Sequence, residues 1–141
     1  MSEQIAEQPT KAESLRPIVL IVDHQKDFCK RLATRMRLHD PTVLLAIATS
    51  LKTAHEVARA YRDRLFVIVT DIMVEGEPGS YVSTLPWIKT LKSSGQVRAI
   101  IAATCAHNEQ LMEAGATEAV QDFPTLHLQI LDRFHAVHSA V

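Results

Sequence analysis

The sequence predicts an α/β protein in which five helices cover the two faces of a doubly wound, five-stranded parallel sheet. Short apolar runs rich in β-branched residues alternate with amphipathic helical segments from residue 17 onward. The apolar runs are continuous, as is typical of strands buried on both faces of a parallel sheet. A chain of 141 residues is also the right size for one domain with one core. We therefore expect right-handed crossovers that place helices on both sides of the sheet.

The first half of this domain reads strand, helix, strand, helix, strand. The predicted strands are residues 18–22, 43–48 and 65–69. The first helical segment ends at Asp40, before Pro41, and the second covers residues 52–64. Both helices are predicted from apolar residues at helical spacing, namely Phe28, Leu32 and Met36 in the first and Ala54, Val57, Ala58 and Tyr61 in the second.

The second half begins with an irregular stretch at residues 80–86, where we find no clear period. Pro86 suits the first turn of a helix that stops at Gly95. A fourth strand is predicted at residues 99–105, followed by a short helix capped by Asn108 and ended by Gly115. A short fifth strand within residues 117–123 and a last helix, marked by Leu126, Ile130, Phe134 and Val137, complete the pattern.

Composition narrows the classes of partner. The formal net charge is −1, so the chain lacks the basic excess with which proteins bind nucleic acid or anionic lipid. No apolar run approaches the roughly 18 residues of a membrane span. Residues 1–16 are polar, and we expect them to form a disordered tail before a domain at residues 17–141. Cys29 and Cys105 match no metal or redox spacing, so we expect a cytoplasmic protein with reduced thiols.

Polar residues gather where the predicted strands end. In a doubly wound sheet the working crevice lies outside the carboxyl ends of the strands, which places Asp23, Asp71, Thr104 and the turn Gln121–Asp122 on one rim. Asp71 is then a nucleophile, a metal ligand or the polar cap of a strand. Two carboxylates that converge suit Mg²⁺, and a cation beside Asp71 would let it attack a phosphoryl group. The Thr104 hydroxyl would then bind a phosphoryl oxygen.

Four segments in this order resemble the receiver domains of two-component response regulators, between about residues 18 and 137. They are IVLIVDHQKDF, VIVTDIMVEGEPG, AIIAATCA and GATEAVQDFP. The resemblance implies the flavodoxin-like fold with strand order 2-1-3-4-5, and a phosphorelay role rather than an enzyme of metabolism. It also implies that Asp71 is the phosphoacceptor and Thr104 its hydroxyl partner. The metal ligands would be Asp23, Asp71 and the backbone carbonyl of Met73.

The same resemblance implies partners and a cofactor. The partners would be a histidine kinase or phosphotransfer protein and a downstream protein, with no nucleic acid and no membrane. Such domains often form homodimers through the face from helix four to helix five. The implied cofactor is Mg²⁺, although His24 stands where the second anionic ligand belongs.

Further departures from the receiver pattern keep two functions open. Glu75 replaces a proline, Asp122 stands at the position of a lysine, and Ala119 replaces an aromatic residue. The loop from Gly79 to Trp87 is longer than usual. The first function is a receiver phosphorylated on Asp71, and the second is a degenerate receiver that binds proteins without phosphorylation. A metabolic enzyme is disfavoured because the chain lacks a glycine-rich phosphate loop and has Met73 where aspartyl phosphatases carry a second aspartate.

Overall fold

The computed structural model describes residues 17–61, 64–77, 79–95, 97–104, 106–120 and 123–139. Its main sheet is parallel, with five strands in the order β2-β1-β3-β6-β7. The strands are β1 (Ile18–Val22), β2 (Leu44–Ala48), β3 (Leu65–Val69), β6 (Val97–Ala102) and β7 (Glu118–Ala119). Counted within this sheet, the order is 2-1-3-4-5, so the predicted fold class is confirmed.

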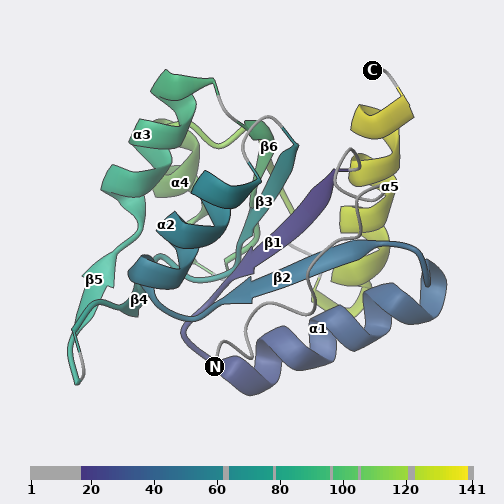
Figure 1. The fold of residues 1–141 in the computed structure, drawn as a ribbon, viewed down its shortest axis with the longest axis horizontal. Coiled ribbons are helices and arrows are strands. Elements are labelled where there is room, and N and C mark those ends of the chain that lie inside the picture. The colour runs from purple at the N-terminus through teal and green to yellow at the C-terminus, as the bar shows by residue number, and fades with distance from the viewer. Residues whose placement is uncertain are drawn as a thin grey trace.

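Helices cover both faces of the sheet (Figure 1). One face carries α1 (Lys26–His39) and α5 (Leu126–Ser139), the latter preceded by a 3-10 turn at Phe123–Thr125. The other face carries α2 (Leu51–Ala60), α3 (Leu85–Ser94) and α4 (Asn108–Ala114). None of the helices in the described part of the chain has the length and apolarity that a bilayer span requires.

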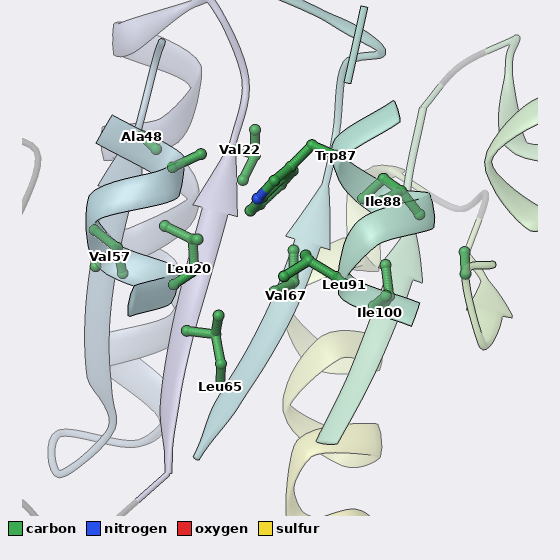
Figure 2. Packing of buried hydrophobic residues seen from close by; sticks show 14 of the residues in the cluster. Leu20, Val22, Ala48, Val57, Leu65, Val67, Trp87, Ile88, Leu91 and Ile100 are labelled. Atoms are coloured by element: carbon green, nitrogen blue, oxygen red, sulfur yellow. The ribbon is translucent and has the colours of Figure 1, made fainter. Parts of the chain in front are cut away.

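The core consists of two apolar layers, one on each side of the sheet. Alternate residues of each strand face opposite sides, so Leu20 and Val22 join the layer under α2 and α3, whereas Val19 and Ile21 join the layer under α1 and α5. Figure 2 shows the first layer, where Trp87 of α3 lies against the sheet. All five residues of β1 are buried, as expected for an interior strand of a doubly covered sheet.

A small hairpin departs from the sequence prediction. The stretch after Asp71 forms β4 (Met73–Glu75) and β5 (Tyr81–Ser83), which pair antiparallel and project beside α2 and α3 (Figure 1). The sequence predicted no regular element here, because each strand has only three residues. The backbone N–H of Glu75 donates to the Thr49 carbonyl at 3.2 Å, which fixes the hairpin to the end of β2.

Two local predictions are also corrected. The fourth main strand covers Val97–Ala102 rather than residues 99–105, because it pairs with β3 from its first residue. The cap of α4 is His107, and Asn108 is the first residue inside the helix. The predicted disordered tail at residues 1–16, together with Cys105, Gln121 and Asp122, lies outside the described residues.

Candidate functional site

Hydrogen bonds that continue past the strand ends position the two predicted aspartates. The N–H of Asp23 donates to the Ala48 carbonyl at 3.2 Å, and the N–H of Thr70 donates to the Val22 carbonyl at 3.0 Å. The residues that follow β1 and β3 are therefore held side by side at the carboxyl edge of the sheet. Asp23 and Asp71 meet there, as the order of the strands predicted.

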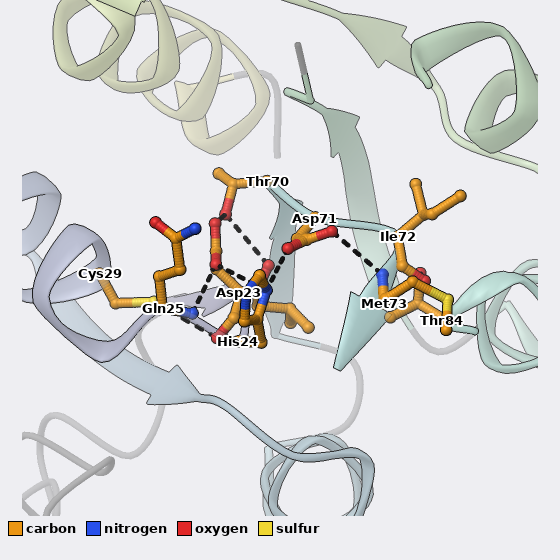
Figure 3. Close-up of polar contacts among 10 residues, drawn as sticks. Asp23, His24, Gln25, Cys29, Thr70, Asp71, Ile72, Met73 and Thr84 are labelled. Carbon is orange, nitrogen blue, oxygen red and sulfur yellow. Dashed lines mark hydrogen bonds and ion pairs between the residues drawn. The ribbon is translucent and has the colours of Figure 1, made fainter. Parts of the chain in front are cut away.

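Asp23 is the buried carboxylate of the pair, with 6% of its surface exposed. One of its oxygens accepts a hydrogen bond from the Gln25 N–H at 2.7 Å, and the other accepts from the Thr70 hydroxyl at 2.6 Å (Figure 3). Burial raises the pKa of Asp23 above its ordinary value, and the two hydrogen bonds offset only part of that effect. These hydrogen bonds hold the Asp23 carboxylate in place, and its predicted role as a metal ligand stays a prediction.

Asp71 is bound by the imidazole of His24. The His24 Nδ1 contacts Asp71 Oδ2 directly, and it lies 3.7 Å from Asp23 Oδ1 (Figure 3). An ionised carboxylate only accepts hydrogen bonds, so Nδ1 carries the proton and donates it. The other Asp71 oxygen accepts from the Met73 N–H at 3.2 Å. The imidazole therefore lies between the two carboxylates, with about a quarter of the Asp71 side chain exposed.

Thr104 follows β6 and is buried, but its hydroxyl is bonded to the start of α4. It accepts a hydrogen bond from the His107 N–H at 2.8 Å and donates to Asn108 Oδ1 at 3.1 Å. The Asn108 amide in turn donates to the Val120 carbonyl at 3.3 Å, which connects α4 to the end of β7. Thr104 thus supports the loop that begins α4, and among the described residues no hydrogen bond links it to Asp71.

The β4–β5 hairpin borders the site. Tyr81 of β5 places its ring edge-on to the His24 imidazole, with 5.4 Å between ring centroids and an interplanar angle of 77°. Tyr81 is itself more than half exposed. The contact of Met73 with the site is through its N–H, so its predicted role as a carbonyl ligand stays a prediction. His24 is therefore held by Asp71 on one side and by an aromatic ring on another.

The site does not fit Mg²⁺ as it stands. Asp23, His24 and Asp71 offer ligand atoms within 4.8 Å of one another. However, one of these three donors is an imidazole nitrogen, whereas Mg²⁺ prefers oxygen ligands in near-octahedral geometry. An imidazole nitrogen with two carboxylates is a donor set closer to that of zinc and related ions.

Sequence reasoning located the two aspartates but missed the residues that hold them. The sequence predicted no role in the site for Thr70 or for Tyr81. The signal for Thr70 was its place directly before Asp71, which puts its hydroxyl level with the residue that follows β1. Asp122, the residue at the predicted lysine position, lies outside the described residues.

No protein-family model and no curated protein matches the chain. Solved structures do match it. The chemotaxis response regulator CheY4 of Vibrio cholerae is 19% identical, with a TM-score of 0.63 over 86% of this chain and 98% of that one. The receiver domain of NtrX from Brucella abortus is 16% identical, with a TM-score of 0.64 over 87% and 99%. The structure of an atypical orphan response regulator, described as having a phosphorylation-independent regulatory mechanism, is 13% identical, with a TM-score of 0.59 over 83% and 94%.

Proposed function

We propose that this chain, which has the fold of response regulator receiver domains, is a signalling module that binds partner proteins without phosphorylation of Asp71. The observation that carries the proposal is the contact between His24 Nδ1 and Asp71 Oδ2. Phosphoryl transfer requires a carboxylate oxygen that is free to approach phosphorus in line, with cations to neutralise the charge. Here that oxygen is bonded to a neighbouring side chain.

Charge supports the same proposal. A phosphoryl group on Asp71 would add negative charge close to the buried Asp23 carboxylate, since the ligand atoms of the two residues lie within 4.8 Å. At such a separation two unit charges repel by about 3 to 4 kcal/mol at an effective dielectric constant near 20. The family relies on a divalent cation to offset this repulsion, and the donor set does not fit Mg²⁺. In place of a divalent cation, His24 offers Asp71 one hydrogen-bond donor.

A second function, phosphorylation of Asp71 by a histidine kinase or phosphotransfer protein, is favoured by a different observation. Asp71 follows the central strand β3 at the carboxyl edge, and about a quarter of its side chain is exposed. A donor molecule can therefore reach it if His24 turns away. The orphan regulator among the similar structures has a phosphorylation-independent regulatory mechanism, which favours the first function for a chain of this fold.

Intact-mass measurement after incubation with acetyl phosphate and Mg²⁺ tests the proposal. We expect no added phosphate on the wild-type protein under conditions that phosphorylate a CheY-type receiver in a parallel reaction. A gain of one phosphate that disappears in Asp71→Asn would establish the second function instead. Beryllium fluoride with Mg²⁺ gives an independent readout, because it should leave the amide NMR spectrum of the wild-type protein unchanged.

The variant His24→Asp identifies the residue responsible. It replaces the imidazole with the anionic ligand that the receiver pattern carries, and we expect it to gain Mg²⁺ binding in the millimolar range, measured as amide shifts around residues 23 and 71. His55→Asp is the matched control, because His55 is an exposed histidine on α2 whose ring lies against Trp87. If the wild-type protein binds Mg²⁺ as tightly as His24→Asp, His24 does not close the site.

A further inference from the structure

A second feature of the molecule lies between α1 and α5. These helices pack together on one face of the sheet, and a cavity of about 230 Å³ opens between them. Its apolar wall is formed by Phe28 and Leu32 of α1 and by Leu126 at the start of α5. We call this cavity the α1–α5 groove. A space of this size takes a small molecule rather than a folded element.

Cationic side chains form the rest of the groove. Arg31 and Arg35 lie one turn apart on α1, so both guanidinium groups are on the same face of the helix. His127 of α5 completes the lining, and the His39 ring lies 5.1 Å from the His127 ring. Within the described residues no acidic side chain forms an ion pair with Arg31 or Arg35.

Within the described residues, the charge of Arg31 and Arg35 is therefore not balanced by an ion pair. The Nδ1 of His127 is buried and has no hydrogen-bond partner among the described residues. Burial lowers the pKa of His127, and His39 and Arg35 lower it further. The two positive charges of Arg31 and Arg35 lie close together beside His127 and repel each other. This local positive charge contrasts with the formal net charge of −1 of the whole chain. An anion in the groove would relieve this repulsion.

We propose that the α1–α5 groove binds a small organic anion, with its phosphate, sulfonate or carboxylate group on Arg31 and Arg35 and its apolar body against Phe28, Leu32 and Leu126. Guanidinium groups are suited to this chemistry because they offer several donors in a planar fork that matches such anions. The apolar wall distinguishes an organic anion from inorganic phosphate. The site is separate from Asp71, so this inference does not rest on the proposed function.

Three probe compounds separate charge from apolar contact. The first is 8-anilino-1-naphthalenesulfonate, whose fluorescence reports binding, the second is its uncharged analogue N-phenyl-1-naphthylamine, and the third is inorganic sulfate. We expect the sulfonate to bind about tenfold more tightly than either of the others, as the loss of one charged contact or of the apolar body would give. Equal binding of the uncharged analogue would overturn the proposal.

Substitutions in the groove test whether the sulfonate binds there. The double variant Arg31→Gln, Arg35→Gln should bind the sulfonate at least about tenfold more weakly. Arg37→Gln is the matched control, because Arg37 is an exposed arginine on the same helix that does not line the groove. It should change binding by less than about twofold. A similar loss in both variants, or amide shifts centred away from α1 and α5, would show that the sulfonate binds elsewhere and would refute the assignment.

Discussion

At the scale of single residues, His24 changes what the carboxyl edge of the sheet can do. An acidic side chain at this position would add a third carboxylate to Asp23 and Asp71, and only a cation could hold the three together. The imidazole instead donates a hydrogen bond to Asp71, and its Nδ1 lies 3.7 Å from Asp23 Oδ1. The two carboxylates are thereby held in place by hydrogen bonds within the protein.

Asp23 itself is predicted to cost stability at neutral pH. Its folded pKa is raised above the ordinary value of 3.8, mainly by burial. A carboxyl with a raised pKa favours folding below its unfolded pKa, and this contribution is lost as the pH rises through the folded pKa. In Asp23→Asn the amide oxygen can still accept from Gln25. The amide NH₂ of the asparagine can donate to the Thr70 hydroxyl oxygen. The Thr70 hydroxyl can then donate its own proton to the Val22 carbonyl, which lies 3.2 Å away.

We therefore expect Asp23→Asn to raise the free energy of unfolding by about 1 kcal/mol at pH 7. The gain should vanish as the pH falls below about 4, where Asp23 is protonated in both states. Urea unfolding across this pH range measures it. Asp132→Asn, at an exposed position on α5, is the control and should change little. A loss of stability at pH 7 in Asp23→Asn would mean that the ionised form is favoured by its hydrogen bonds after all.

The sequence predicted the position of each aspartate but not the state of either. Strand order alone places Asp23 and Asp71 together, because parallel strands end at the same edge. The contact of His24 with Asp71 depends on a side-chain rotation and on Tyr81, which comes from a hairpin with no sequence signal of its own. Thr104 shows the same limit, since its hydroxyl bonds to residues of α4 that only the folded loop brings close.

At the scale of elements, periodicity located the segments that are long enough to show it. The apolar run of β1 formed where the sequence predicted it. The helix predicted at residues 52–64 formed as α2, but it ends at Ala60, with Tyr61 as its C-cap. The hairpin strands have three residues each, and in β4 only Val74 is buried between two exposed neighbours. An alternation this short is indistinguishable from loop sequence, so tertiary contacts, such as that of Glu75 with Thr49, decide whether it forms.

The turn after α4 allows a prediction about how α3 and α4 pack. Gly115 ends α4 with a φ of +130°, and a Cβ there would lie 2.7 Å from the Lys92 Cβ of α3. Gly115→Ala must therefore strain its backbone and separate two helices. We expect a loss of about 2 to 4 kcal/mol in the free energy of unfolding, measured with urea. Gly95→Ala is the control, because Gly95 also has a positive φ of +65° but meets nothing within 4 Å.

That control should lose only about 1 kcal/mol, the cost of a left-handed residue with a side chain. The difference between the two alanine variants then reports the contact with Lys92 together with the larger backbone strain at Gly115, because a φ of +65° lies in the left-handed region that alanine can adopt and +130° does not. Equal losses would contradict the prediction, because they would show that neither the Lys92 contact nor the φ of +130° adds to the cost at Gly115. Such a result would mean that the close approach of α3 and α4 is loose at this point.

At the scale of the whole molecule, the sheet separates the two apolar layers. The helix α5, the last element in the sequence, packs into one of these layers. Phe134 of α5 packs edge-on against Phe66 of β3, with 5.3 Å between ring centroids and an interplanar angle of 87°. Phe66 is fully buried in the central part of the sheet. Through this pair, α5 packs against β3, the strand that precedes Asp71.

Removing the Phe134 ring should therefore weaken the whole fold rather than one helix. Phe134→Ala leaves a cavity beside Phe66, and we expect the free energy of unfolding to fall by about 3 to 4 kcal/mol in a single cooperative transition. Leu128→Ala is the control, since Leu128 lies on the same helix with 43% of its surface exposed, and should cost less than about 1 kcal/mol. Amide exchange distinguishes the alternatives: if α5 alone loses protection while β1 and β3 keep theirs, α5 unfolds as a separate unit and the two layers are not coupled through Phe66.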